Sequence, residues 1–180
     1  GQMGGGTGVW SSVERNWADE HGAITGPLTP QPNFAIFGGT PGVVTVYNDY
    51  GLVQATGIQF LSDGYRLNGQ VLTLVGSGGA APLIRVGSGS ADSRTLIATI
   101  DNIVDGSDGI SKTDAGTLVL NGDNRYRGGT QINGGTLSVS RDSNLGNASG
   151  GIVLDGGTLR ITGTGFSQTV DSTAAVARLC

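Results

Sequence analysis

The stretch "GGTQINGGTLSVS", residues 128–140, decides the fold. It contains two Gly-Gly pairs and two short apolar runs, residues 130–132 and 136–139. Neither run can build a core on its own, because an ordinary strand is longer, about five or six residues. The chain turns again after very few residues, so its core must come from many such runs placed side by side.

The same pattern returns along the chain at a nearly constant interval. Gly-Thr-Leu occurs at residues 116–118, 135–137 and 157–159. Going backwards at a similar interval, Leu96 precedes the first of these leucines and Leu72 precedes Leu96, and each begins a short apolar run. A period of about 20 residues with three short strands predicts one rung of a right-handed parallel β-helix, or β-solenoid.

In such a column each strand pairs with the equivalent strands of the rungs above and below, and few inward side chains per strand are enough. We expect Leu118, Leu137 and Leu159 to stack inward at one position. The next inward position, two residues on, holds Leu120, Val139 and Ile161, and the position between them faces outward with Val119, Ser138 and Arg160. About six rungs spaced by about 4.8 Å give a column on the order of 30 Å long.

The composition supports an all-β fold. Of the 180 residues, 34 are glycine and 5 are proline, while 37% are hydrophobic and 13% charged. Those values exclude collagen and do not fit disorder. Twelve aspartates against two glutamates, and nine arginines against one lysine, favour turns over helices.

Charge and hydropathy exclude several classes of function. The net charge is −4 and the arginines are scattered, so the basic stripe that nucleic acid binding needs is missing. No window approaches the roughly 18 apolar residues of a membrane span. The start, "GQMGGGTG", lacks the charged leader and apolar core of a signal peptide, so we expect a piece of a longer precursor. Cys180, the last residue, is given no function.

Four segments follow from the pattern. Residues 1–37 hold both tryptophans and the only histidine and are predicted to be an N-terminal capping segment, through which the chain enters the column. Residues 38–104 are predicted to form irregular rungs and residues 105–165 regular rungs, while residues 166–180 form a last strand or a C-terminal tail. The short strands are expected at 43–47, 52–55, 58–61, 65–67, 71–75, 83–86, 96–103, 118–120, 131–132, 137–139, 152–154 and 159–161.

The regular part resembles a known family. "GISKTDAGTLVLNGDNRYRGGTQINGGTLSVS", residues 109–140, is similar to the passenger-associated repeat of Gram-negative autotransporters, the type V secreted proteins. The matching residues are Gly109, Lys112, Gly116, Thr117, Leu118, Leu120, Gly122, Asn124, Tyr126, Gly128, Thr130, Ile132, Gly135, Thr136 and Leu137. One departure is Asp114-Ala115, where the family often has a glycine. Upstream, "GVWSSVERNW" and the segment from "FAIFGG" onward also resemble passenger segments of autotransporter adhesins.

The resemblance implies a β-helical passenger exported across the outer membrane by a C-terminal translocator β-barrel that lies outside this sequence. Family members act as adhesins, self-associating proteins, proteases, esterases or cytotoxins. The repeat itself belongs to the stalk and carries no chemistry, so function has to be argued from individual sites.

The sequence offers little to an enzyme hypothesis. His21 lies beside Asp19 and Glu20, and the nearest serines in sequence are Ser11 and Ser12. The Gly-x-Ser-x-Gly elbow, the Gly-Asp-Ser-Gly sequence of the secreted autotransporter proteases and the Gly-Asp-Ser block of the esterase passengers are absent. We therefore expect a solvated loop histidine and no catalytic residues.

The acidic residues are better explained by turns than by metal. Asp-Gly pairs begin at Asp63, Asp105, Asp108 and Asp155, but the tandem nonapeptide of calcium β-rolls and the EF-hand spacing are missing. "DNIVDGSDG", residues 101–109, is the densest group and leaves a weak calcium site open; no metal or cofactor is predicted.

Two further patterns argue against chemistry on the column. Paired outward carboxylates, which glycoside cleavage needs, are not found, and only Lys112 could serve as a lysine base. "VGSGSADS", residues 86–93, lacks the lysine of a P-loop and is expected to protrude between rungs.

Aromatic side chains are the candidates for binding. Tyr47, Tyr50, Tyr65 and Tyr126 are considered, together with whichever of Trp10 and Trp17 is exposed, because tyrosine rings suit sugars and interfaces. Tyr126 falls on a repeat position and is expected to pack against its rung.

The sequence thus predicts a non-enzymatic passenger at the bacterial surface or outside the cell, acting in adhesion, host interaction or self-association. Its expected partners are a host protein or glycan, or like chains, and not nucleic acid. A carbohydrate-binding or carbohydrate-cleaving β-helix and a pure structural stalk are the alternatives.

Overall fold

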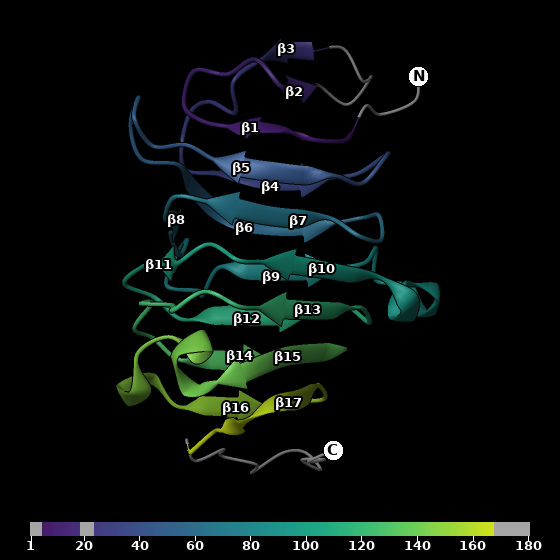
Figure 1. The fold of residues 1–180 in the computed structure, drawn as a ribbon, viewed down its shortest axis with the longest axis vertical. Helices are drawn as coiled ribbons and strands as arrows, with labels where there is room; N and C mark the ends of the chain where they lie inside the picture. The colour runs from purple at the N-terminus through teal and green to yellow at the C-terminus, as the bar shows by residue number, and fades with distance from the viewer. Residues whose placement is uncertain (1–4, 19–23, 168–180) are drawn as a thin grey trace.

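The computed structural model describes residues 5–18 and 24–167, and its polypeptide winds into a column of stacked circuits (Figure 1). The fold is an all-β parallel β-solenoid of about six turns with about 23 residues per turn. Among the described residues there is no α-helix, only three short 3₁₀ helices: η1 (Ala91–Thr95), η2 (Asp142–Leu145) and η3 (Ala148–Gly150). The all-β parallel solenoid predicted from the sequence is confirmed, although its turns are somewhat longer than the period of the leucines suggested.

Two parallel sheets run the length of the column. The seven-stranded sheet has the order β1 (Gly8–Trp10), β5 (Val43–Val46), β7 (Arg66–Gly69), β10 (Ile97–Ile100), β13 (Thr117–Leu120), β15 (Thr136–Arg141) and β17 (Thr158–Gly165). The eight-stranded sheet has the order β11 (Val104–Asp105), β8 (Leu72–Leu74), β6 (Gln54–Phe60), β9 (Leu83–Val86), β12 (Ile110–Thr113), β14 (Thr130–Ile132) and β16 (Ile152–Leu154), with β4 (Asn33–Phe37) also paired to β6. Near the N-terminal end, β2 (Trp17–Ala18) and β3 (Ile24–Gly26) pair antiparallel.

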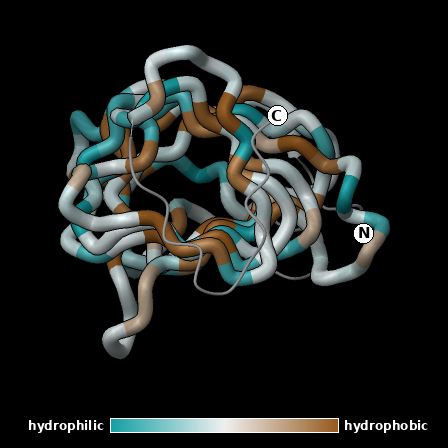
Figure 2. The backbone as a smooth tube through the Cα atoms, turned by 90° about the horizontal axis from the view of Figure 1, so that it is seen from below, coloured by the Kyte–Doolittle hydropathy of each residue, from teal (hydrophilic) through white to brown (hydrophobic). Residues whose placement is uncertain are grey.

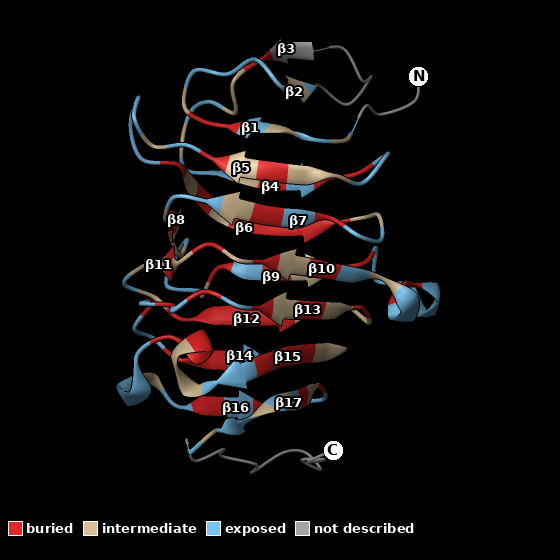
Figure 3. Ribbon diagram, in the orientation of Figure 1, coloured by how far each residue is buried: buried red, intermediate tan, exposed pale blue. Residues whose placement is uncertain are grey.

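The inward column predicted from the Gly-Thr-Leu repeats is present. Leu118 pairs in register with Leu137, and Leu137 with Leu159. Their side chains are at most 5% exposed. Because every circuit adds such residues, apolar segments gather around one interior when the molecule is viewed along the column (Figure 2). Buried positions alternate with intermediate ones along β5 and β13, whereas β12 and the end of β6 are buried almost throughout (Figure 3).

The backward extension of the repeat is wrong at two leucines. Ala98, not Leu96, pairs with Leu118, and Leu72 lies in β8 of the other sheet, paired with Val104. The circuit from Leu67 to its partner Ile100 is much longer than the later ones, because it contains β8, β9 and the η1 loop. Simple counting at a fixed period cannot follow the register through such an insertion.

The N-terminal end of the column is packed with aromatic rings. The centroid of Phe37 lies 5.6 Å from Trp10, 5.4 Å from Trp17 and 5.3 Å from Phe60. Within residues 1–37, β1 and β4 already belong to the two long sheets, whereas β2 and β3 do not. The division of the chain into a cap, irregular rungs, regular rungs and a tail stays a prediction.

Side-chain amides join successive circuits at the turn after the seven-stranded sheet. The Asn124 Oδ1 atom accepts a 2.8 Å hydrogen bond from the Val104 N–H, and its Nδ2 donates to the Asn144 carbonyl at 2.6 Å. Asn144 in turn donates to the Gly122 carbonyl at 3.0 Å. Buried turn backbone is thereby satisfied by asparagine, which explains why Asn124 belongs to the repeat.

Candidate functional site

The two most exposed large apolar side chains of the described residues, Tyr50 and Leu52, lie in the turn between β5 and β6, together with the less exposed Tyr47. Tyr50 is 64% exposed, Leu52 60% and Tyr47 37%. We call residues 47–52, with Gln70 of the neighbouring circuit, the tyrosine turn. Single exposed apolar residues are ordinary on protein surfaces, but two rings and a leucine gathered in one turn favour a binding surface.

The tyrosine turn carries a carboxylate, Asp49, between Tyr47 and Tyr50 in the sequence. The centroids of Tyr47 and Tyr50 are 5.8 Å apart and the ring planes are inclined by 58°. Hydrogen bonds from Tyr47 and from Gln70 lower the pKa of Asp49, and the same bond and the charge of Asp49 raise the pKa of Tyr47. The Gln70 Nε2 atom lies 3.0 Å from Asp49 Oδ1. The turn therefore presents aromatic faces and an ionised acceptor together.

The tyrosine turn is held on both sides. On the side of β1, the Ser12 hydroxyl donates to the Tyr50 carbonyl at 2.8 Å, and the Tyr47 N–H donates to the Trp10 carbonyl at 3.0 Å. On the other side, the Asn48 side chain donates to the Val71 carbonyl at 2.7 Å. A turn fixed to two neighbouring circuits loses little conformational freedom when it binds a ligand.

Of the other aromatic candidates, three are buried and one is half-buried. Tyr65 is only 2% exposed and donates its hydroxyl toward the Gly38 and Thr40 carbonyls, at 2.7 and 2.9 Å, so its expected role as an outward ring is wrong. Tyr126 is fully buried, as its repeat position predicted, and burial raises its pKa. Trp10 is fully buried and Trp17 is half-buried.

The catalytic candidates are not assembled among the described residues. His21, Asp19 and Glu20 lie outside them, as does Cys180. The Ser11 hydroxyl is buried and accepts from the Glu14 N–H at 3.0 Å, which is a turn contact.

The carboxylates of residues 101–109 point to separate partners. Asp101 is paired with Arg66 and accepts from Asn121, whereas Asp105 accepts from the N–H of the next residue at 2.7 Å. Asp108 accepts from the Gly76 N–H at 3.1 Å. In the described part of the chain, no group of three or more His, Cys, Asp or Glu residues could hold a metal ion.

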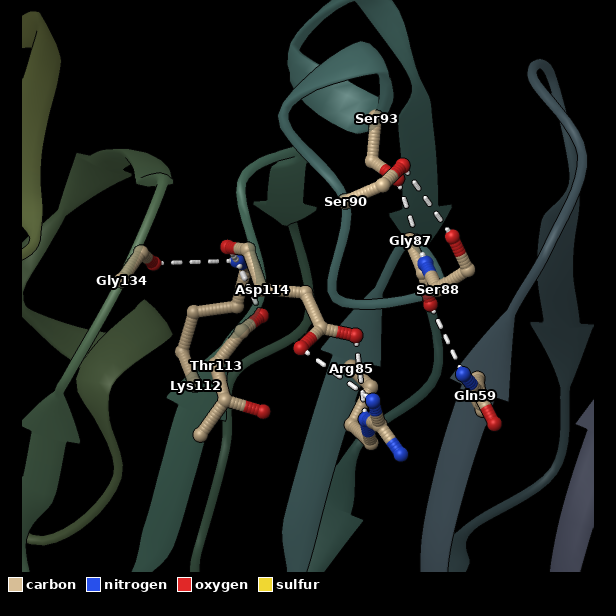
Figure 4. A network of polar contacts seen from close by, with 10 residues as sticks. All are labelled: Gln59, Arg85, Gly87, Ser88, Ser90, Ser93, Lys112, Thr113, Asp114 and Gly134. Carbon is tan, nitrogen blue, oxygen red and sulfur yellow. Dashed lines mark hydrogen bonds and ion pairs between the residues drawn. The ribbon is translucent and has the colours of Figure 1, made fainter.

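Lys112 is buried in β12 instead of facing solvent (Figure 4). Its ammonium group donates to the carbonyls of Thr113 at 2.7 Å, Asp114 at 3.0 Å and Gly134 at 3.1 Å. Burial lowers its pKa to about 8, and the charge of Asp114 opposes that lowering. All three of its donors are engaged with backbone, so the side chain ties two successive turns together and does not present a base to a substrate.

Asp114 explains the one departure from the repeat. It is the only non-glycine residue with positive φ among those described, at 62°, a conformation that glycine adopts without cost and aspartate tolerates. Its carboxylate accepts from Arg85 Nε at 3.0 Å and from Arg85 Nη2 at 3.3 Å. The ion pair joins β9 to the corner after β12, so the position usually held by glycine contributes an additional contact here.

The loop at residues 86–93 protrudes from the column, as predicted. Figure 1 shows η1 projecting beyond the sheet edges, and Ser88 to Asp92 are exposed. At its base Gln59 donates to the Gly87 carbonyl at 2.8 Å, and the Ser93 hydroxyl accepts from the Ser88 N–H at 3.2 Å (Figure 4).

Comparison with known proteins agrees with this architecture. Residues 110–139 match the family model described as the passenger-associated-transport-repeat. The chain is 42% identical over 183 aligned residues to a protein of Brucella suis biovar 1 (strain 1330) described as "Adhesin BmaC autotransporter"; the match covers 98% of this chain and 5% of that protein. No solved structure matches.

None of the described residues forms a helix long and apolar enough to cross a membrane. The stacked leucines, the buried Lys112, the matched repeat and the similarity over nearly the whole chain agree with one another. The chain belongs to the passenger regions of autotransporters.

Proposed function

We propose that this chain is a non-enzymatic, adhesive segment of an autotransporter passenger, and that the tyrosine turn is its contact surface. The observation that carries the proposal is the exposed pair of Tyr47 and Tyr50 on a turn anchored to two circuits. Tyrosine is enriched where proteins bind one another or sugars, since its ring is large, rigid and partly polar.

The similarity to a protein named as an adhesin supports this function. As a passenger, the chain acts at the bacterial surface or outside the cell. Its partners are then a host surface protein or glycan, or like chains, and a translocator domain in the precursor. In the carbohydrate-binding alternative the same turn carries the ligand; in the stalk alternative it carries none.

Adhesion of coated beads tests the proposal. Beads carrying the 180-residue chain are counted on cultured host cells beside blank beads and beads carrying Tyr50→Ala. The control is Val153→Ala, an exposed residue of β16 in the other sheet. We expect the chain and the control to adhere equally, and Tyr50→Ala to lose most of the adhesion.

Adhesion no better than that of blank beads would favour the stalk. Adhesion that survives Tyr50→Ala would place the contact on another surface. Turnover of a peptide, ester or glycan by the chain, lost on one substitution, would contradict the non-enzymatic part of the proposal.

A further inference from the structure

We propose that the tyrosine turn binds a neutral glycan, with a hexose stacked on Tyr50 and its hydroxyl groups donating to Asp49. This inference rests on the proposed adhesive function and specifies its ligand. It starts from two rings inclined by 58° and from the carboxylate of Asp49, which is hydrogen-bonded to Tyr47 and to Gln70 of the next circuit.

A sugar fits this combination better than an apolar protein surface does. The axial C–H groups of a hexose form an apolar face that can cover a tyrosine ring, while its hydroxyls remain free to donate hydrogen bonds. A carboxylate covered by apolar side chains would lose its water without replacement, which is costly. Hydroxyl donors replace that water, and hydrogen bonds to an ionised acceptor are stronger than neutral ones.

The charges favour an uncharged sugar over an acidic one. Asp49 is negatively charged at neutral pH, as aspartates ordinarily are, and the hydrogen bonds from Tyr47 and Gln70 lower its pKa further. The groups that hold the turn, on Ser12, Trp10, Gln70 and Val71, are all uncharged, so nothing among them compensates a sialic acid or a sulfate. The chain as a whole carries a net charge of −4, which also repels anionic ligands.

The site is formed before the ligand arrives. Asn48 donates to Val71 and accepts from the Val53 N–H at 2.8 Å, and the Gly51 N–H closes the turn on the Asn48 carbonyl at 3.0 Å. The Asn48 N–H also donates to the Gln70 side chain, which orients the amide that holds Asp49. A ligand therefore meets groups whose positions are set by the stacking of circuits.

The test is a glycan array with neutral, sialylated and sulfated glycans, followed by titration of the strongest neutral binder by calorimetry. We expect neutral glycans to dominate, and Tyr50→Ala to weaken binding by about ten-fold or more. Asp49→Asn should weaken neutral binding and reduce the discrimination against sialylated glycans. Val153→Ala should bind as the unchanged chain does, and circular dichroism should show the same fold in all variants.

The outcomes separate this inference from the function beneath it. Preference for acidic glycans, or glycan binding indifferent to Tyr50→Ala, overturns the inference. Absence of glycan binding while the beads still adhere to cells through Tyr50 also overturns it, but leaves adhesion in place and indicates a protein receptor. Absence of both glycan binding and bead adhesion removes the proposed function itself.

Discussion

At the scale of the residue, Lys112 shows how the fold changes the chemistry of a side chain. It is the only lysine of the chain, and the structure buries its ammonium group among three carbonyls. An uncharged amine is favoured by burial, so the pKa falls to about 8 from the ordinary value of 10.5. Because no other lysine is present, its titration can be observed without overlap.

The ¹³Cε chemical shift of Lys112 should titrate at about pH 8. In urea the same signal should move at about 10.4, the value of an unfolded chain. The measurement is a pH series of carbon NMR spectra on uniformly labelled protein. A folded-state midpoint at or above the unfolded one would show that the three carbonyls stabilise the charged form more than burial destabilises it.

The lowered pKa of Lys112 also makes the free energy of unfolding depend on pH. Between about pH 8 and 10.4 the unfolded chain binds more protons at this lysine than the folded chain, so the free energy of unfolding rises with pH, by about 1.4 kcal/mol per unit at most. Urea unfolding from pH 7 to 9.5 should show the rise, and Lys112→Met should lower stability and lose the rise. Above pH 10 the raised pKa values of Tyr65 and Tyr126 reverse the trend, because their unfolded forms release protons first.

At the same scale, the positions of some side chains could be predicted from the sequence and those of others could not. Alternation within a repeat correctly placed Leu137 inward, because every second residue of a strand shares a face. Tyr65 lies two residues before the buried Leu67 and shares its inward face, although it was considered as an outward ring, and its hydroxyl donates to two carbonyl acceptors inside. Lys112 broke the apolar pattern of β12, so that strand was missed, although the family motif already contained the lysine. Lys112 is interior here because three backbone carbonyls of adjacent turns accept hydrogen bonds from its ammonium group.

At the scale of the element, glycine sets how closely successive corners approach. A Cβ on Gly128 would lie 2.2 Å from the Gly109 nitrogen, and one on Gly150 would lie 2.4 Å from the Gly129 nitrogen. These neighbours are backbone atoms, which cannot turn aside as side chains do. The Gly-Gly pair that begins the quoted stretch is therefore needed for stacking, and this role could be predicted from the sequence.

Gly128→Ala should lower the free energy of unfolding by about 2 kcal/mol or more, since two backbones must separate to admit one methyl group. Gly165→Ala is the matched control: it lies in β17, has nothing within 4 Å of the added Cβ, and does not have a positive φ. Urea unfolding of the three proteins measures the difference. Through the unfolded chain alone, either substitution would raise stability, because alanine restricts the unfolded backbone more than glycine does. Gly128→Ala as stable as Gly165→Ala would therefore contradict the contact between the two corners.

The lengths of the circuits, in contrast, could not be predicted element by element. The circuit from Leu118 to Leu137 passes through β14 alone, whereas the circuit from Leu67 to Ile100 contains β8, β9 and η1. An insertion such as η1 leaves the column at one corner and returns to the same strand position. It therefore changes the number of residues in the circuit but not the pairing of strands between circuits. Only the pairing of Ala98 with Leu118 reveals where the register resumes.

At the scale of the whole molecule, each circuit touches only its neighbours, so stability should spread over short distances. Leu118 and Leu137 are direct partners, whereas Val44 lies in β5, separated from Leu137 by three strands of the same sheet. Three intervening strands make four inter-strand spacings, which at about 4.8 Å each separate the two residues by roughly 19 Å. The tyrosine turn follows β5 directly, and by the same reasoning it depends on the packing around Val44 and not on the last circuits.

A double-mutant cycle tests this locality. Leu137→Ala should cost about 2–5 kcal/mol, and its coupling to Leu118→Ala should be about 0.5 kcal/mol or larger, because the two cavities adjoin. Its coupling to Val44→Ala should be smaller than about 0.5 kcal/mol. Glycan or cell binding measured on the same variants should weaken with Val44→Ala and stay unchanged with Leu137→Ala while the protein remains folded. Strong coupling between the distant pair would mean that the column responds as one cooperative body, and the tyrosine turn would then be sensitive to every circuit below it.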